Sequence, residues 1–169
     1  MKKQIKNIVI LLGIIAVVIT GLVWLTNGSK KSPTAAIGGE VGGVLTLGES
    51  KYDFGTVSMA KGKVSKEFAL ENKSDKNVQI DQVFTSCMCT EAELKVGNKT
   101  AGPFGMQGHG ITRGADLVVK SGETLIVKAI FDPAAHGPSG VGPIERQVVI
   151  NTGDSQNPVV LDFKAVVTP

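Results

Sequence analysis

The chain has 169 residues, of which 42% are hydrophobic and 20% are charged, with 21 glycines and two cysteines. This length suits one domain with a substantial core, and the composition excludes collagen-like, coiled-coil, disordered and disulfide-framed small proteins. The formal charge of +3 comes from Lys2, Lys3 and Lys6, because the other 15 basic residues balance the 15 acidic ones. We therefore expect no nucleic-acid partner, since such proteins gather positive charge on one face.

An apolar run from Ile8 to Leu25 follows these lysines and is interrupted only by two glycines and Thr20. Its length just suffices for a helix that spans a bilayer. A secretory signal peptide has a shorter apolar core and ends in a small-residue cleavage site, so we favour an uncleaved anchor over a cleaved signal. Lysines before the run keep the N-terminus inside. We predict a cytoplasmic segment at residues 1–7, a transmembrane anchor at 8–25, and a single-pass cell-membrane protein whose domain is extracytoplasmic.

Residues 26–49 predict a flexible linker, because Ser32-Pro33 and the glycine pairs of this segment interrupt helices and strands. From Tyr52 onward, apolar residues recur at every second position, which is typical of strands, and turn residues separate the runs. The pattern predicts an all-β fold over residues 50–169, an antiparallel β-sandwich of immunoglobulin type, with no helix after the anchor. The inward positions are Val64, Phe68, Leu70; Val78, Ile80, Phe84; Leu125, Val127, Ala129, Phe131; Val148, Ile150; Val159, Leu161, Phe163, Ala165 and Val167.

Five short motifs carry a family resemblance: Tyr52-Asp53-Phe54-Gly55-Thr56-Val57, Phe68-Ala69-Leu70-Glu71-Asn72, Thr85-Ser86-Cys87-Met88-Cys89-Thr90, Ile130-Phe131-Asp132-Pro133 and Asn157-Pro158-Val159-Val160. Together they resemble domain of unknown function 1573, a bacterial family related to Hydin-like and PapD-like immunoglobulin folds. The similarity covers roughly residues 50 to 167, and the Ser-Cys-x-Cys-Thr block is its most specific part. The resemblance implies a sandwich outside the cytoplasmic membrane and brings no activity. A glycine-rich insert, 97–114, and an expanded loop, 133–143, depart from the family pattern.

Residues that bind soft metals gather in this part of the chain. The candidate ligands are Cys87, Cys89, Met106, His109 and His136, and the two histidines lie in predicted loops. Thiolate, thioether and imidazole together favour copper, with cysteine and methionine selecting copper(I), whereas calcium and magnesium prefer oxygen ligands. We therefore expect a copper site, with Met106 as the weakest ligand.

Two alternatives remain open at this stage. Residues two apart in a strand lie roughly 6.6 Å apart, so a disulfide between Cys87 and Cys89 would need a bend. Such a disulfide, without metal, would suit a structural or interaction module with an envelope protein partner. The position of His136 depends on strand count: it returns to the cysteine end if residues 90–96 and 117–119 form one interrupted strand, and not if they form two.

We expect no enzymatic activity. The chain lacks the Gly-x-Ser-x-Gly elbow, the phosphate-binding loop, the dinucleotide fingerprint and the His-Glu-x-x-His motif. Redox enzymes usually place Cys-x-x-Cys at the start of a helix, where the helix dipole stabilises the thiolate. No helix is predicted next to Cys87, so the remaining classes are a copper-binding domain and an interaction module.

The predicted topology can be tested in intact cells. The lysines before the apolar run predict that a membrane-impermeant label reaches the domain and does not reach residues 1–7. Labelling of engineered single cysteines in a chain with Cys87→Ser and Cys89→Ser would read out both sides. A protected domain would reverse the orientation, and a released domain that begins after Gly28 would show that the apolar segment is cleaved.

Overall fold

The computed structural model describes residues 45–109, 114–153 and 157–169. The predicted cytoplasmic segment, the predicted anchor at 8–25 and most of the predicted linker lie outside these residues. Among the residues that it does describe, the structure contains no helix with the length and apolar character needed to cross a membrane.

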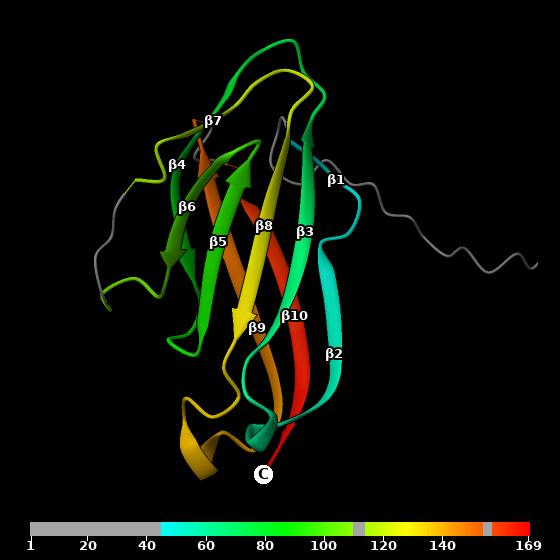
Figure 1. Ribbon diagram of the computed structural model, residues 1–169, viewed down its shortest axis with the longest axis vertical. Helices are drawn as coiled ribbons and strands as arrows, with labels where there is room; N and C mark the ends of the chain where they lie inside the picture. The colour runs from blue at the N-terminus through cyan, green and yellow to red at the C-terminus, as the bar shows by residue number, and fades with distance from the viewer. Residues whose placement is uncertain (1–44, 110–113, 154–156) are drawn as a thin grey trace, which may run out of the picture. The chain divides into compact units, whose positions relative to one another are not determined.

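Strands and two short 3-10 helices make up the regular structure of these ranges. The first sheet has the order β1-β3-β8-β5-β6 and the second β2-β10-β9-β4-β7, and the two layers face each other (Figure 1). All strand pairs are antiparallel except that of β2 with β10, which is parallel. The elements are β1 (Leu45–Leu47), β2 (Lys51–Ser58), η1 (Met59–Lys61), β3 (Val64–Asn72), β4 (Val78–Thr85), β5 (Thr90–Val96), β6 (Lys99–Phe104), β7 (Leu117–Val119), β8 (Thr124–Phe131), η2 (Gly137–Gly140), β9 (Gly142–Thr152) and β10 (Val159–Thr168).

The predicted β-sandwich is confirmed, and its core consists of the alternate residues that face inward between the sheets. All five predicted positions of β10 are buried, as are the four of β8. The rings of Phe131 and Phe163 come from different sheets and lie 5.7 Å apart, so they join the two layers directly. Burial of such large side chains removes much apolar surface from water and is the main stabilising contribution to a sandwich of this kind.

The prediction that Phe84 faces the core is wrong. The pairing of β4 with β9 shifts register between Ile80 and Gln82, which is a β-bulge. A bulge adds one residue and reverses the alternation that follows it. Val83, at 3% exposure, and Thr85, at 1%, therefore face the core, while Phe84 is only half-buried.

The predicted start of the sandwich at residue 50 is also late. Leu45 and Leu47 are 1% and 2% exposed, and their strand β1 pairs with β3. Three residues are too few to display a convincing alternation, and the glycines before them suggested coil. The last part of the predicted linker therefore belongs to the first sheet.

The Asp-Phe-Gly motif forms an irregularity in β2. Gly55 has a φ of 66°, and its N–H donates a hydrogen bond of 2.8 Å to Oδ1 of Asp53. That hydrogen bond lowers the pKa of Asp53, and Lys164 acts in the same direction. Because glycine adopts this backbone conformation without strain, the motif marks the point where the register against β10 shifts.

Replacing Phe131 by alanine tests the assignment of the core. Phe131 is 2% exposed and touches the opposite sheet, so Phe131→Ala should lower the free energy of unfolding by about 3 to 5 kcal/mol. Chemical denaturation of the full chain in detergent measures this loss. Val166→Ala is the matched control, because Val166 is 48% exposed and should change the stability by less than about 0.5 kcal/mol. Equal effects of the two variants would contradict the packing described here.

Candidate metal centre

The two cysteines lie in the turn that connects β4 to β5. The N–H of Thr90 donates to the carbonyl oxygen of Cys87 at 3.1 Å, and Oγ1 of Thr85 lies 3.0 Å from the same oxygen. This bend brings the Cα atoms of Cys87 and Cys89 to 5.3 Å, and a disulfide joins the two residues. The extended geometry considered from the sequence is therefore replaced by a turn, and the turn permits the bond.

His136 reaches the same turn from the loop after β8. The N–H of Asp132 donates to the carbonyl oxygen of Cys89 at 2.9 Å, and Oδ1 of Asp132 accepts from the N–H of Ala134 at 2.9 Å. The hydroxyl of Ser139 donates to the carbonyl oxygen of His136 at 2.7 Å. These bonds shape the loop so that Nε2 of His136 lies 3.2 Å from Sγ of Cys87.

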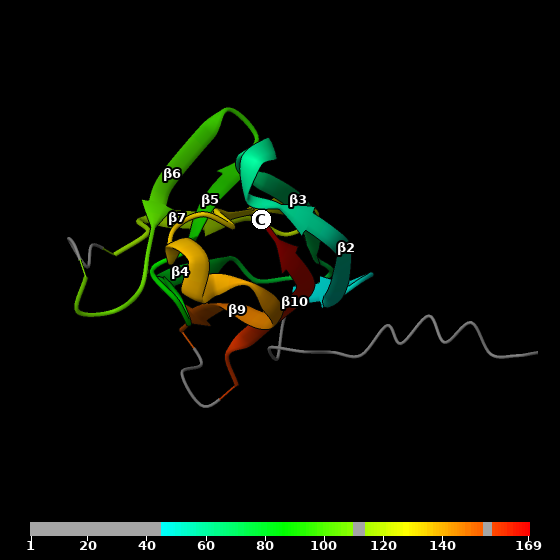
Figure 2. The ribbon, with the colours of Figure 1, turned by 90° about the horizontal axis from the view of Figure 1, so that it is seen from below.

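Strand count explains why this loop returns to the cysteine end. Residues 90–96 and 117–119 form two strands in different sheets, β5 and β7. The glycine-rich insert adds a third, β6, which the sequence reading missed. Three strands reverse the chain direction as one strand would, so β8 ends where β5 begins, with Phe131 opposite Thr90. Figure 2 shows the chain from this end, where η2 lies near the C-terminus.

Within the described residues, Cys87, Cys89 and His136 form a group whose ligand atoms could hold a metal ion. Their three ligand atoms lie within 4.8 Å of one another. Cys89 is 2% exposed, Cys87 is half-buried and His136 is exposed, so the cluster opens to solvent on the histidine side. Reduction of the disulfide would turn the two sulfurs into thiolates, and two thiolates with one imidazole form a donor set that suits a soft metal ion.

Met106 and His109 lie elsewhere in the loop after β6. Met106 forms an isolated bridge with Thr85, and its carbonyl oxygen accepts from the N–H of His109 at 3.1 Å. Both residues line a small pocket together with Phe84 and Phe104. His109 is not part of the three-residue cluster, whereas Met106 pairs with Thr85, the residue at the end of β4 that precedes the cysteine turn.

Two residues that the sequence reading did not select also border the centre. Arg146, in β9, donates from Nε to Sγ of Cys89 at 3.2 Å. A β-carbon on Gly140 would lie 3.6 Å from Cε of Met59 and 3.1 Å from Cβ of His136, so Met59 packs beside the histidine loop. The sequence could have indicated Arg146, because a charged residue stands at a core-facing position between Ile144 and Val148 in the alternation of β9.

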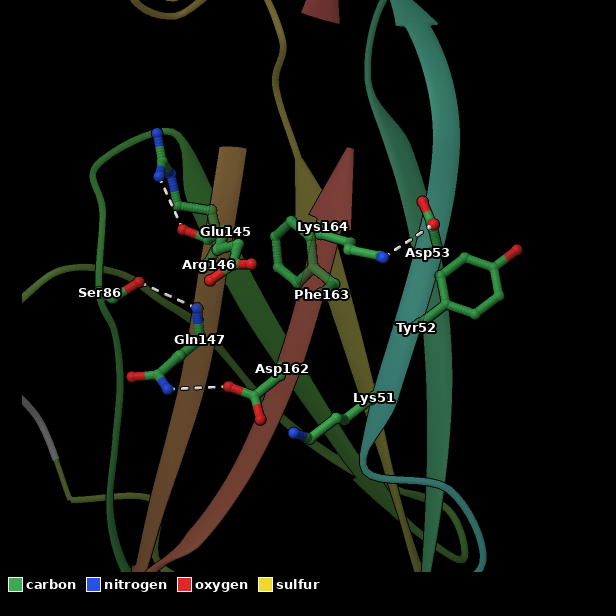
Figure 3. A pocket seen from close by; sticks show the side chains of 10 residues that line it. All are labelled: Lys51, Tyr52, Asp53, Ser86, Glu145, Arg146, Gln147, Asp162, Phe163 and Lys164. Carbon is green, nitrogen blue, oxygen red and sulfur yellow. Dashed lines mark hydrogen bonds and ion pairs between the residues drawn. The ribbon is translucent and has the colours of Figure 1, made fainter. Parts of the chain in front are cut away.

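Hydrogen bonds between the cysteine turn and β9 hold Arg146 in place. Ser86 donates its N–H to the carbonyl oxygen of Gln147 at 3.0 Å and accepts from the N–H of Gln147 through Oγ at 2.9 Å. Arg146 also donates from Nη1 to the carbonyl oxygen of Glu145 at 2.7 Å. Figure 3 shows these residues along an open pocket of about 940 Å³ that also includes the Lys164 and Asp53 ion pair.

Comparison with known proteins gives a family match over part of the chain. Residues 45–103 match the model of the family described as protein of unknown function (DUF1573). The resemblance drawn from the motifs is thus confirmed over these residues. The match includes the Cys-x-Cys turn, begins before residue 50 and ends well before residue 167. No curated protein matches the sequence.

A solved structure with a TM-score above 0.5 supports the fold and nothing beyond the fold. A protein of unknown function from Porphyromonas gingivalis W83 has a TM-score of 0.52 and 15% identity, over 73% of this chain and 46% of that one. The secreted serine protease VesC from Vibrio cholerae has a TM-score of 0.46 and 14% identity, over 77% and 24%. The ASH / PapD-like domain of human CEP192 has a TM-score of 0.38 and 14% identity, over 83% and 94%. The chain therefore spans less than half the length of the first two.

The disulfide predicts the reactivity of the isolated protein. The denatured full chain, prepared without reductant, should show no thiol that reacts with an aromatic disulfide reagent, and reactive thiols should be released after reduction, because both cysteines are paired within the chain. Cys87→Ser is the control, since it leaves Cys89 without its partner and should expose a reactive thiol without reduction. Free thiols in the oxidised wild type would contradict the pairing.

Proposed function

We propose that the domain binds copper(I) through Cys87, Cys89 and His136 when the two cysteines are reduced. The observation that supports this proposal is the convergence of their ligand atoms within 4.8 Å. Reduction of the disulfide frees two thiolates, and the imidazole next to Cys87 supplies a third donor. Copper(I) accepts such soft, low-coordinate sites, whereas hard cations do not.

The charge around the cluster favours a copper(I) complex. Two thiolates and one copper(I) ion carry one net negative charge, and the guanidinium of Arg146 lies next to one of the sulfurs. A hydrogen bond from outside the ligand set orients a ligand and stabilises its charge. Arg146 would thus balance the bound complex without contacting the ion.

The proposed ligand set is narrower than the five residues selected from the sequence. We restrict the proposed ligands to the three residues whose donor atoms converge and treat Met106 and His109 as neighbours of the site. A fourth protein ligand is unnecessary for copper(I) bound by two thiolates and an imidazole. His109 therefore becomes a useful control.

The cellular setting that we propose is the outer side of a cell membrane, with the segment at 8–25 as the anchor. The lysines before that segment support this orientation. An oxidising exterior would favour the disulfide form of the cysteine turn. The disulfide itself supports a second candidate function, a metal-free structural or interaction module with an envelope protein partner, and the titration below distinguishes the two.

Copper(I) titration of the reduced full chain tests the proposal. Anaerobic competition with a coloured copper(I) chelator should give one tight site in the wild type, and Cys87→Ser with Cys89→Ser should abolish it, because the variant lacks both thiolates. His136→Ala should weaken binding by about ten- to a hundredfold. Equal affinity of the wild type and the double serine variant would contradict the proposal and favour the structural disulfide.

His109→Ala serves as the matched control, since it also removes one exposed imidazole. It should leave the affinity unchanged if the three-residue cluster is the site. A loss equal to that of His136→Ala would restore the larger ligand set. Stronger binding of zinc than of copper(I) in a competition between the two metals would contradict the proposed metal.

A further inference from the structure

We propose that the Cys87 and Cys89 disulfide also exchanges with external thiols, so that the domain passes two electrons between thiols and disulfides. This activity requires no metal and does not depend on the proposed copper site. It follows from the unequal environments of the two sulfurs, which differ in exposure and in their hydrogen-bond partners. Each environment matches one of the roles in thiol–disulfide exchange.

Exposure selects Cys87 as the sulfur that is attacked. Cys89 is 2% exposed, whereas Cys87 is half-buried and Met88 beside it is 56% exposed. An attacking thiolate must approach one sulfur of the disulfide closely, and access decides which sulfur it reaches. The turn therefore presents Cys87 to solvent and shields Cys89.

Arg146 makes Cys89 the better leaving group. Its Nε donates to Sγ of Cys89 at 3.2 Å, and none of the ion pairs found in the described ranges includes Arg146. A guanidinium without a carboxylate partner remains available to stabilise the negative charge that develops on the departing sulfur. Cys89 therefore leaves as a thiolate that is already hydrogen-bonded.

The second half of the reaction returns Cys87 to the thiol form. Sγ of Cys87 accepts from the N–H of Cys89 at 3.4 Å and lies 3.2 Å from Nε2 of His136. These groups can stabilise the thiolate of Cys87 when the mixed disulfide breaks. Both sulfurs thus have a polar side-chain partner of their own, His136 for Cys87 and Arg146 for Cys89.

The steps balance as follows. A first external thiolate attacks Sγ of Cys87, a bond forms between these sulfurs, and the bond to Cys89 breaks with its electron pair left on Cys89. A second external thiolate attacks the outer sulfur of the mixed disulfide and releases Cys87 as a thiolate. Two external thiols are oxidised to one disulfide, the protein pair is reduced by two electrons, and the two protons of the external thiols pass to the protein sulfurs or to solvent. The reverse reaction reduces an external disulfide.

This arrangement replaces the helix that redox proteins usually use. A Cys-x-x-Cys motif at a helix N-terminus obtains positive charge from the helix dipole. The described part of the chain has no α-helix, and Arg146 and His136 supply polar groups at the same sulfurs from a strand and a loop. The Cys-x-Cys loop is also so short that closing it contributes little chain entropy, which leaves the sandwich folded when the bond opens.

Single cysteine variants of the full chain test which sulfur reacts. With a metal chelator present, reduced Cys89→Ser and reduced Cys87→Ser are each mixed with oxidised glutathione, and mass spectrometry follows the mixed disulfide. Cys89→Ser should form it at Cys87 at least about tenfold faster than Cys87→Ser forms it at Cys89, because Cys89 is shielded. Equal rates, or a faster reaction of Cys89, would overturn the proposal.

Reduction of the oxidised protein tests the role of Arg146. Glutathione and a reduced cysteine peptide are tested separately as reductants. Both should reduce the wild-type disulfide, since each supplies an attacking thiolate. Failure of both reductants would overturn the proposal. Arg146→Gln should slow reduction by about tenfold, whereas Arg146→Lys should retain part of the rate. Lys164→Gln is the matched control, because it removes a cation from the same pocket without touching Cys89.

Thermal unfolding of each variant verifies that the fold is retained. Equal slowing by Arg146→Gln and Lys164→Gln would overturn the assignment of Arg146 as the stabilising group. Failure of exchange with intact copper(I) binding would remove only the exchange proposal. Exchange without copper(I) binding would remove only the proposed metal site, so the two proposals can fail separately.

Discussion

The antiparallel pairing of β5 with β8 is the interaction on which the candidate centre depends. It places Thr90, which follows the cysteine turn, opposite Phe131, which precedes the histidine loop. The bond from the N–H of Asp132 to the carbonyl oxygen of Cys89 continues this ladder beyond the ends of both strands. Two segments more than forty residues apart in the sequence thus become neighbours through backbone hydrogen bonds. The same hydrogen bonds that build the first sheet bring their side chains together.

The sandwich was predictable because its apolar alternation is strong. A period of two over β8 and β10 marks which residues face inward, and burial follows directly from it. The alternation fails to predict the orientation of Phe84, because a bulge in β4 inverts it. The residue types of Asp81-Gln82 do not indicate that bulge. Strand β1 was missed because three residues are too few to show an alternation, and strand β6 was missed because few apolar residues mark it within the glycine-rich insert.

The candidate centre was predictable only in part. The cysteines and His136 were selected by chemical type, but sequence spacing could not decide whether the intervening strands were odd or even in number. His109 and Met106 have chemistry similar to that of the selected ligands, and they lie on the loop after β6, where His109 is outside the group of converging ligand atoms. Arg146 was visible as a charge among core-facing residues, yet its partner is the sulfur of Cys89 in the turn between β4 and β5, which no local pattern encodes.

The shortness of the cysteine loop has a practical consequence for how the domain would respond to its surroundings. Opening or closing a ring this small changes the conformational freedom of the unfolded chain very little. The redox state of the turn is thus nearly decoupled from the global folding equilibrium. Melting curves would therefore report poorly on the redox state of this turn. Local probes, such as thiol trapping or the imidazole resonances of His136, would detect the change in redox state.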